Sequence, residues 1–356
     1  MKMYWYKTTL IALTLTMFSA CSNDNDEPDN GLNPIETTAP GAYIVNTGNW
    51  DANNASIQWY DLTKATLSSD LYEAANGKKI GDAQDLCVYG SKVYITGSTS
   101  AKIEVVSSKN FTILKTIPLS NESGQAITPR YMTATGGNVY FTAYDGTVSK
   151  LDTTSLSITG TVQVGGYPEA LTNANGKLYV NLSDYNWDST GKQIAVINLS
   201  TFTKVKELDV ILNPYDECMT GDDGKVYFVS TGHSDGNPSH TLQCIDPETD
   251  EVTSLCTASK IAKKGNKIYF IHSEYSTDDK QIGVYDLETK KTSDFINYSD
   301  ISNPGSIDVD PVSGDVYISS QLSKALNEVY IYGSDGTFKK KIETGYYTTR
   351  VRFRYK

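Results

Sequence analysis

The stretch Gly265-Asn-Lys-Ile-Tyr-Phe270 decides the fold, because its pattern of glycine, hydrophobic residue, tyrosine and hydrophobic residue returns along the chain, with small variations. The tyrosines of the seven copies are Tyr43, Tyr94, Tyr140, Tyr179, Tyr227, Tyr269 and Tyr317. They are separated by 51, 46, 39, 48, 42 and 48 residues. A period of about 40 to 50 residues is typical of propellers and other repeat arrays. Seven copies therefore predict seven blades.

Each copy is accompanied by three further strand-like runs. In one unit the four runs are residues 169–172, 178–181, 194–197 and 204–208. Four short strands bounded by turn residues are typical of a propeller blade. Aspartate recurs at the turn between the last two strands, and its side chain accepts backbone hydrogen bonds in such turns, so we interpret these aspartates as structural rather than catalytic. They are Asp61, Asp152, Asp246 and Asp286.

The two ends of the chain indicate how the ring closes. The first unit begins at the strand of Tyr43 and lacks the strand that precedes the tyrosine strand in other units. Residues 348–355 alternate polar and apolar side chains and follow the seventh unit where an inner strand would fall. Such closure removes exposed sheet edges. We therefore predict an all-β, seven-bladed β-propeller over residues 41–356, with its first blade completed by the C-terminal strand.

The amino terminus has the pattern of an export signal. Lys2 and Lys7 precede an uncharged, largely apolar stretch, and small residues stand directly before Cys21. We interpret residues 1–20 as a signal peptide. The site Phe18-Ser-Ala-Cys21 is similar to the lipobox of bacterial lipoproteins, which predicts that Cys21 is acylated. The alternative is ordinary secretion with a chance cysteine.

Residues 21–40 begin with a polar, acidic run that offers almost nothing to a hydrophobic core, so we expect a disordered tether. Its early acidic residues resemble the signal that sends lipoproteins of Bacteroidota to the outer face of the outer membrane. The chain has 31 basic and 42 acidic side chains, and losing Lys2 and Lys7 with the leader takes its formal charge from −11 to −13. Such a surface repels nucleic acid. We expect a lipid-anchored outer-membrane protein that faces the cell exterior; a spacer in either leaflet is the alternative.

Cysteines and histidines do not form a metal-binding pattern. No CxxC pair is present, and the three histidines do not have zinc spacing. Cys244 and Cys256 flank a predicted hairpin, but counting from its turn places them two residues out of register, so we expect free thiols rather than a disulfide. We predict no metal site.

Motifs that would indicate an enzyme are missing. The chain contains no HExxH, no P-loop and no dinucleotide fingerprint. Scattered acids fall on the loops where a ligand would bind, and we interpret them as turn-forming or solvated groups. They are Asp82, Asp85, Glu169 and Asp216. We therefore predict no catalytic residue and expect a protein that is not an enzyme.

In a four-stranded blade, the loops that lead into the innermost strand and the loops that join the second strand to the third lie on one face of the disc. Tryptophan, tyrosine, asparagine and arginine concentrate on these loops, a mixture typical of recognition surfaces. The alternative for any single tyrosine is packing between blades or lining the channel. We predict that the ligand contacts include Asn49, Trp50, Arg130, Tyr131, Tyr167, Tyr185, Trp187, Tyr215, Tyr346, Tyr347 and Arg350.

The first blade carries a family resemblance. Tyr43-Ile-Val-Asn-Thr-Gly-Asn-Trp50, followed by residues 53–57 and 75–82, resembles the YVTN/YncE-like propellers of Bacteroidota cell-surface lipoproteins. That group includes lipoproteins that capture cobalamin (vitamin B12) and pass it to a TonB-dependent outer-membrane transporter. The resemblance implies a corrinoid as transported ligand, with no cofactor. Two alternatives stay open: a surface adhesin or glycan-binding component of a nutrient-uptake complex, and a propeller hydrolase or lyase.

Overall fold

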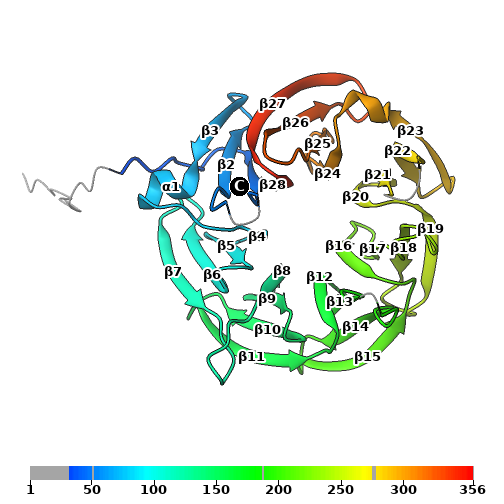
Figure 1. Ribbon diagram of the computed structural model, residues 1–356, viewed down its shortest axis with the longest axis horizontal. Coiled ribbons are helices and arrows are strands. Elements are labelled where there is room, and N and C mark those ends of the chain that lie inside the picture. Colours follow the sequence, from blue (N-terminus) through cyan, green and yellow to red (C-terminus); the bar gives the residue numbers. More distant parts are fainter. Residues whose placement is uncertain (1–31, 50–51, 187, 275–277, 356) are drawn as a thin grey trace, which may run out of the picture. The chain divides into compact units, whose positions relative to one another are not determined.

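The seven tyrosine strands are the second strands of seven four-stranded antiparallel sheets, which form a ring (Figure 1). This computed structural model describes residues 32–49, 52–186, 188–274 and 278–355. Each sheet is one blade, with its first strand at the centre of the ring and its fourth at the rim (Figure 1). The predicted seven-bladed β-propeller is confirmed.

The strands are given blade by blade, from the innermost outward. Blade 1 contains β28 (Thr348–Arg354), β1 (Gly41–Asn46), β2 (Ser56–Asp61) and β3 (Thr66–Asp70). Blade 2 contains β4 (Asp85–Tyr89), β5 (Lys92–Gly97), β6 (Lys102–Ser107) and β7 (Ile113–Pro118). Blade 3 contains β8 (Pro129–Thr135), β9 (Asn138–Ala143), β10 (Thr147–Asp152) and β11 (Ser157–Gln163). Blade 4 contains β12 (Tyr167–Ala174), β13 (Lys177–Ser183), β14 (Gln193–Asn198) and β15 (Thr203–Asp209).

The remaining three blades have the same plan. Blade 5 contains β16 (Pro214–Thr220), β17 (Val226–Ser230), β18 (Thr241–Ile245) and β19 (Val252–Thr257). Blade 6 contains β20 (Lys260–Lys264), β21 (Lys267–Ser273), β22 (Lys280–Asp286) and β23 (Lys291–Ile296). Blade 7 contains β24 (Pro304–Val309), β25 (Val316–Ser320), β26 (Leu326–Tyr332) and β27 (Phe338–Tyr346). Two short helices, α1 (Leu71–Asn76) and the 3-10 helix Tyr298–Asp300, lie in connections between elements.

The repeated tyrosines pack the blades against one another. All seven have at most 3% of their surface exposed. Tyr43 shows the arrangement: its ring centroid lies 4.8 Å from that of Trp59 in its own blade and 5.6 Å from that of Phe111 in blade 2. Each blade can bury its faces only against its neighbours, so every repeat needs a large side chain at the same position between blades. The repeat is thus a packing repeat.

The aspartates at the outer turns have the expected structural role. Asp61 Oδ1 accepts hydrogen bonds from the backbone N–H groups of Thr63 (2.9 Å) and Lys64 (2.8 Å). Asp286 Oδ1 does the same for the two equivalent residues of blade 6, at 3.0 and 2.7 Å. The hydrogen bond from Lys64, with that from Thr63, holds the pKa of Asp61 below its usual range.

The C-terminal strand closes the ring as predicted. β28 pairs antiparallel with β1, placing Val351 opposite Ile44, and the register shifts once near Asn46. The Val351 N–H donates to Asp308 Oδ2 of β24 (2.8 Å), which fastens the strand to blade 7. Arg350 Nη1 donates to Glu217 Oε1 of β16 (2.7 Å), on the far side of the ring's centre. The first blade is therefore completed by the last strand.

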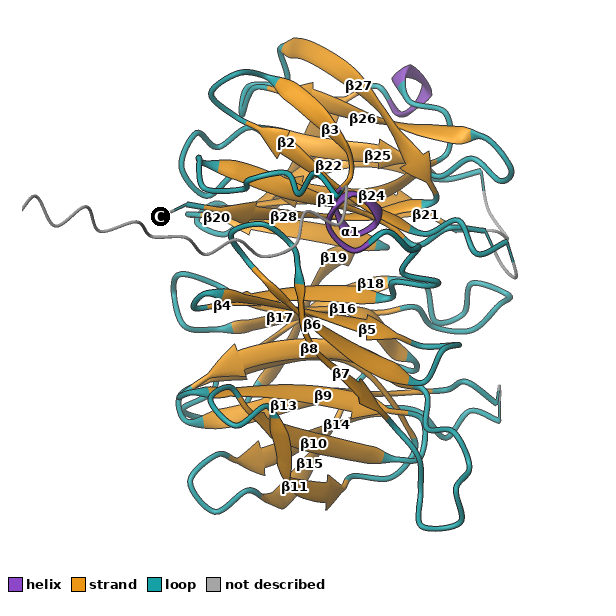
Figure 2. Cartoon of the chain, turned by 90° about the vertical axis from the view of Figure 1, so that its left-hand side faces the viewer, coloured by secondary structure: helices purple, strands orange, loops and turns teal. Residues whose placement is uncertain are grey.

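The disc has two loop-bearing faces, which appear on opposite sides in Figure 2. We call the upper face the one that carries the loops leading into the innermost strands, and the lower face the other. Thr37, just before β1, donates its N–H to the carbonyl of Lys109 in the β6–β7 turn (2.8 Å), and Tyr355 Oη donates to Asp310 in the β24–β25 turn (2.5 Å). Both turns lie on the lower face. The described ends of the chain are therefore on the face opposite the predicted contacts.

The cysteines of the described residues are free, as expected. Cys256 lies opposite Leu242 and Cys244 lies opposite Thr253 in the β18–β19 pair, so the two thiols are out of register. Cys21 falls outside the described residues. In the described part of the chain, no helix is long and apolar enough to cross a membrane.

Candidate functional site

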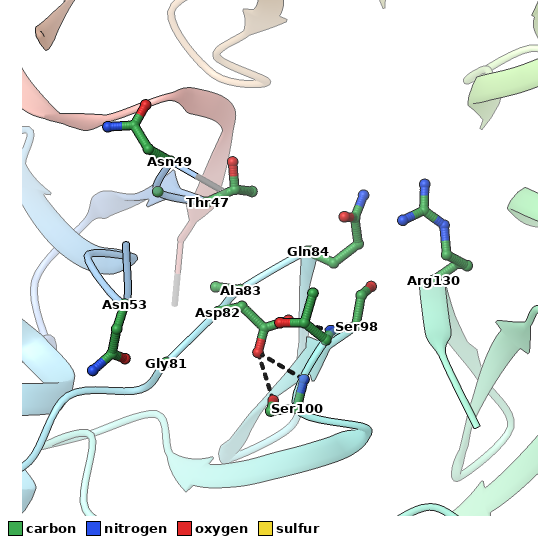
Figure 3. Close-up of a pocket in the computed structure, with 12 residues that line it drawn as sticks. Thr47, Asn49, Asn53, Gly81, Asp82, Ala83, Gln84, Ser98, Ser100 and Arg130 are labelled. Atoms are coloured by element: carbon green, nitrogen blue, oxygen red, sulfur yellow. Dashed lines mark hydrogen bonds between the residues drawn. The ribbon is translucent and has the colours of Figure 1, made fainter. Parts of the chain in front are cut away.

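The two sets of loops predicted to share a face meet on the upper face. Asp82, in the loop that leads into β4, accepts hydrogen bonds from the Thr99 N–H (2.7 Å) and the Ser100 hydroxyl (2.5 Å) in the β5–β6 loop (Figure 3). The Asp82 carboxylate is thus occupied in joining two loops. It has a structural role there.

A cavity of about 380 Å³, which we call the amide pocket, opens beside this junction. Its polar lining comes from blades 1, 2 and 3 and includes Asn49, Asn53, Gln84 and Arg130. In Figure 3 the Gln84 amide and the Arg130 guanidinium extend in the same direction from neighbouring blades. Two of the predicted contacts, Asn49 and Arg130, therefore line one pocket. Gln84 was not predicted as a contact, although it lies between Asp82 and Asp85 in a loop that the sequence assigns to this face.

Arg130 is fixed and neutralised by a buried carboxylate. Its Nε and Nη2 donate to Glu169 Oε2 (2.9 Å) and Oε1 (3.3 Å), and the Tyr144 hydroxyl also donates to Oε1. The Glu169 side chain is fully buried. Burial raises its pKa, against the opposing effects of Arg130 and Tyr144. The pair presents oriented guanidinium N–H groups with little net charge, which suits neutral carbonyl and amide acceptors.

Three tyrosines form a cluster next to this ion pair. The ring centroids of Tyr144, Tyr167 and Tyr185 are separated by 4.9 to 5.6 Å. Arg130 Cζ lies 4.8 Å from the Tyr144 centroid, so the guanidinium covers one ring of the cluster. Tyr185 is 53% exposed and offers a flat apolar surface with a polar edge. Tyr167 and Tyr185 were predicted. Tyr144 was missed, although it lies on a loop of the same class, between β9 and β10.

A larger cavity, which we call the aromatic hollow, lies on the other side of the cluster. Its volume is about 800 Å³, and it is built by loops of blades 4, 5 and 6. Its lining includes the predicted contacts Tyr185 and Tyr215 together with His240 and Glu274, which sequence reasoning missed. Tyr185 also lines a third cavity of about 460 Å³, with Tyr167. The cavities on this side of the face therefore meet at Tyr185.

Two predicted contacts lie beneath the face. Tyr131 and Arg350 are only 7% and 8% exposed and line a channel cavity of about 80 Å³. The Tyr131 hydroxyl accepts from Gln84 Nε2 (3.1 Å), so this residue supports the floor of the amide pocket. Arg350 is held by Glu217 and by the Asp216 carbonyl (2.7 Å each). Both positions support the face rather than form its surface.

The acids of the channel are also engaged. Asp85 Oδ2 accepts from the Met132 N–H (2.9 Å). Asp216 is paired with Lys260, and although burial opposes it, Lys260 and Arg350 hold the pKa of Asp216 below its usual range. The four acids that the sequence places on these loops therefore each have a backbone or cationic partner.

The remaining predicted contacts lie at the junction of blades 7 and 1 or outside the described residues. The carbonyls of Tyr346 and Tyr347 accept from the N–H groups of Gly48 and Thr47 (3.0 Å each), which places both tyrosines beside the amide pocket. Tyr347 is 39% exposed, with a backbone φ of 57°. Trp50 and Trp187 fall outside the described residues.

Comparisons with known proteins agree with this architecture. A family described as "Domain of unknown function (DUF5074)" matches residues 40–353. No curated protein matches the sequence.

Solved structures that resemble the chain are diverse propellers. Hydrazine synthase of Kuenenia stuttgartiensis is 14% identical, with a TM-score of 0.58, over 74% of this chain and 86% of that chain. Dihydro-heme d1 dehydrogenase NirN is 11% identical, with a TM-score of 0.57, and the match covers 90% of this chain and 76% of that chain. The Pan2 WD40 domain of Neurospora crassa is 10% identical, with a TM-score of 0.52, and the match covers 75% of this chain and 79% of that chain. At these identities the likeness concerns the fold alone.

Proposed function

We propose that this chain, which belongs to the DUF5074 family, is a ligand-binding propeller that captures a corrinoid such as cobalamin on its upper face. The observation that carries the proposal is the pairing of two unlike cavities on one face. The aromatic hollow provides flat apolar area, and the amide pocket provides paired donors and acceptors. Tyr185, Tyr144 and Arg130 form a continuous bridge between them.

The chemistry of a corrinoid fits this pairing. A corrinoid is a broad, flat macrocycle edged with amide side chains, so its recognition requires a wide concavity with a few placed polar groups. Asn49 and Gln84 offer both a donor and an acceptor each. Arg130, neutralised by Glu169, offers N–H groups without attracting anions strongly. The exposed ring of Tyr185 offers a stacking surface.

The cellular setting belongs to the same proposal. A lipid anchor on Cys21 would hold the protein at the outer membrane, facing the exterior, and a TonB-dependent transporter would receive the ligand. The described chain reaches β1 along the lower face, where Thr37 is bonded to the β6–β7 turn. At Thr37 the described chain therefore lies on the lower face, opposite the proposed binding surface. The role is binding and transfer rather than catalysis.

Calorimetry of the purified protein with cyanocobalamin tests the proposal. We expect measurable heat at micromolar ligand and a raised melting temperature, because a ligand at 100 times its Kd stabilises the folded state by about 2.7 kcal/mol. A glycan panel, measured in parallel by thermal shift, examines the alternative ligand class. If cyanocobalamin produces neither heat nor a thermal shift, the proposal of a corrinoid ligand is overturned. A thermal shift with a glycan alone would assign the face to sugars.

A further inference from the structure

His240 lies in the wall of the aromatic hollow, directly before β18. Its backbone N–H donates to Glu274 Oε1 (2.6 Å), and its ring nitrogen Nδ1 lies 2.7 Å from the Ser259 hydroxyl. The backbone and one side of the ring are therefore both anchored. Such anchoring is what holds an imidazole in one orientation.

The hydrogen bonds of Ser259 determine which ring nitrogen carries the proton. The Ser259 hydroxyl donates to the Ser273 carbonyl (3.0 Å) and accepts from the Ser273 N–H (3.0 Å). A hydroxyl has a single proton to donate, and we assign it to the Ser273 carbonyl, an oxygen that can only accept. The 2.7 Å contact with His240 is then satisfied only if Nδ1 donates. In this assignment the proton lies on Nδ1, and Nε2 keeps its lone pair.

Nε2 is available to a ligand in the hollow. It forms no hydrogen bond to any residue that the structure describes. A neutral imidazole with a free Nε2 is the form that binds metal ions.

The charge around His240 favours a positive centre. The Glu274 carboxylate accepts hydrogen bonds from the Ser239 hydroxyl and from the His240 N–H. The carboxylate is 4% exposed, and none of the described lysines and arginines forms an ion pair with it. Glu274 therefore brings a buried carboxylate to the hollow without a lysine or arginine of the described chain paired to it.

We propose that His240 Nε2 is an axial ligand to the cobalt of the captured corrinoid, an inference that rests on the proposed function. No group of three metal-binding side chains exists among the described residues, so the hollow does not build a metal site of its own. A corrinoid brings cobalt already held by four ring nitrogens, and an imidazole can take one of its two axial positions. The Nε2 lone pair forms a Co–N bond, the Co–O bond to an axial water breaks, and water leaves. The oxidation state does not change, and the proton stays on Nδ1.

The visible spectrum of aquocobalamin tests this assignment, because its bands shift when imidazole replaces the axial water. We expect the protein to produce that shift at pH 7. His240→Ala should still bind cyanocobalamin in calorimetry but produce no shift with aquocobalamin. The matched control is His233→Gln, which removes another imidazole from the same cavity and should leave the shift unchanged. Ser259→Ala removes the bond that positions the ring and should weaken aquocobalamin binding about tenfold.

The outcomes separate this inference from the proposed function. If the protein binds both cobalamins without a spectral shift, or if His240→Ala keeps the shift, His240 is not the ligand and the corrinoid site still stands. If neither cobalamin binds, both proposals are overturned. If His240→Ala fails to fold, Ser259→Ala decides: an unchanged affinity for aquocobalamin contradicts the assignment.

Discussion

Replacing Arg350 with methionine should weaken the closure of the ring. Arg350 is 8% exposed, and its two terminal nitrogens donate to the Glu217 carboxylate and the Asp216 carbonyl, each at 2.7 Å. It stands on the strand that the C-terminus contributes, so these bonds join the last strand to blade 5. Arg350→Met keeps most of the side-chain volume and removes the charge.

The expected cost follows from what the substitution leaves behind. Removing one partner of a buried ion pair costs about 3 to 5 kcal/mol, because the other charge stays buried. Lys260 Nζ remains 3.6 Å from Glu217 and compensates in part, so we expect about 3 kcal/mol. For a propeller of this size, that corresponds to a melting temperature lower by about 4 to 5 °C.

Scanning calorimetry and urea titration measure this change. The matched control is Lys341→Met, because Lys341 also pairs with a carboxylate, Glu328, at 2.6 Å, but is 53% exposed at the rim. An exposed pair contributes under about 1 kcal/mol, so this variant should melt close to the wild type. If Arg350→Met melts as high as Lys341→Met, the bonds across the channel do not stabilise the closure and the reasoning is refuted.

Three further predictions concern the same body. Deleting residues from Thr348 onward should abolish the cooperative melting transition, because blade 1 loses its innermost strand; an unchanged profile would contradict this. Burial raises the pKa of Asp308 to about 6, so the folded state keeps a proton that the unfolded chain releases near pH 4. The contribution of Asp308 to stability therefore falls as the pH rises from 4 to 6. The melting temperature of Asp308→Asn minus that of the wild type should be larger at pH 7 than at pH 4, and an equal difference at the two pH values would contradict this. Thiol titration of the denatured chain lacking Cys21 should count four free thiols, and a count of two would indicate the disulfide excluded by register.

The sequence predicted the architecture because the fold repeats. Seven tyrosine strands report seven blades, since each must bury the same kind of side chain between neighbouring blades. The alternation of residues 348–355 was sufficient to place the last strand, because a ring leaves one position for it. The register of Cys244 and Cys256 was also countable, because a hairpin pairs residues outward from its turn.

The candidate site was only partly predictable. Loop membership follows from strand order, so the face itself and Asn49, Tyr185 and Tyr215 on it could be inferred. Depth within a loop cannot be inferred, which is why Tyr131 and Arg350 were placed on a surface that they support from below. 

Side-chain partners from neighbouring blades are not visible in a repeat pattern either. The contact of Ser259 with His240 depends on side-chain direction, and His240 has no motif around it. His240 was therefore not considered, because the histidines of the chain lack the spacing of a zinc site. A ligand that carries its own metal does not require such spacing.

Calorimetry of cyanocobalamin binding with one variant on each face tests the central claim most directly. Tyr185→Ala removes the ring at which the cavities of the upper face meet, and Tyr355→Ala removes a tyrosine bonded on the lower face. We predict that Tyr185→Ala weakens binding at least about tenfold, equivalent to about 1.4 kcal/mol, and that Tyr355→Ala binds like the wild type. Wild-type affinity in Tyr185→Ala together with lost binding in Tyr355→Ala would place the ligand on the wrong face for this account and contradict it.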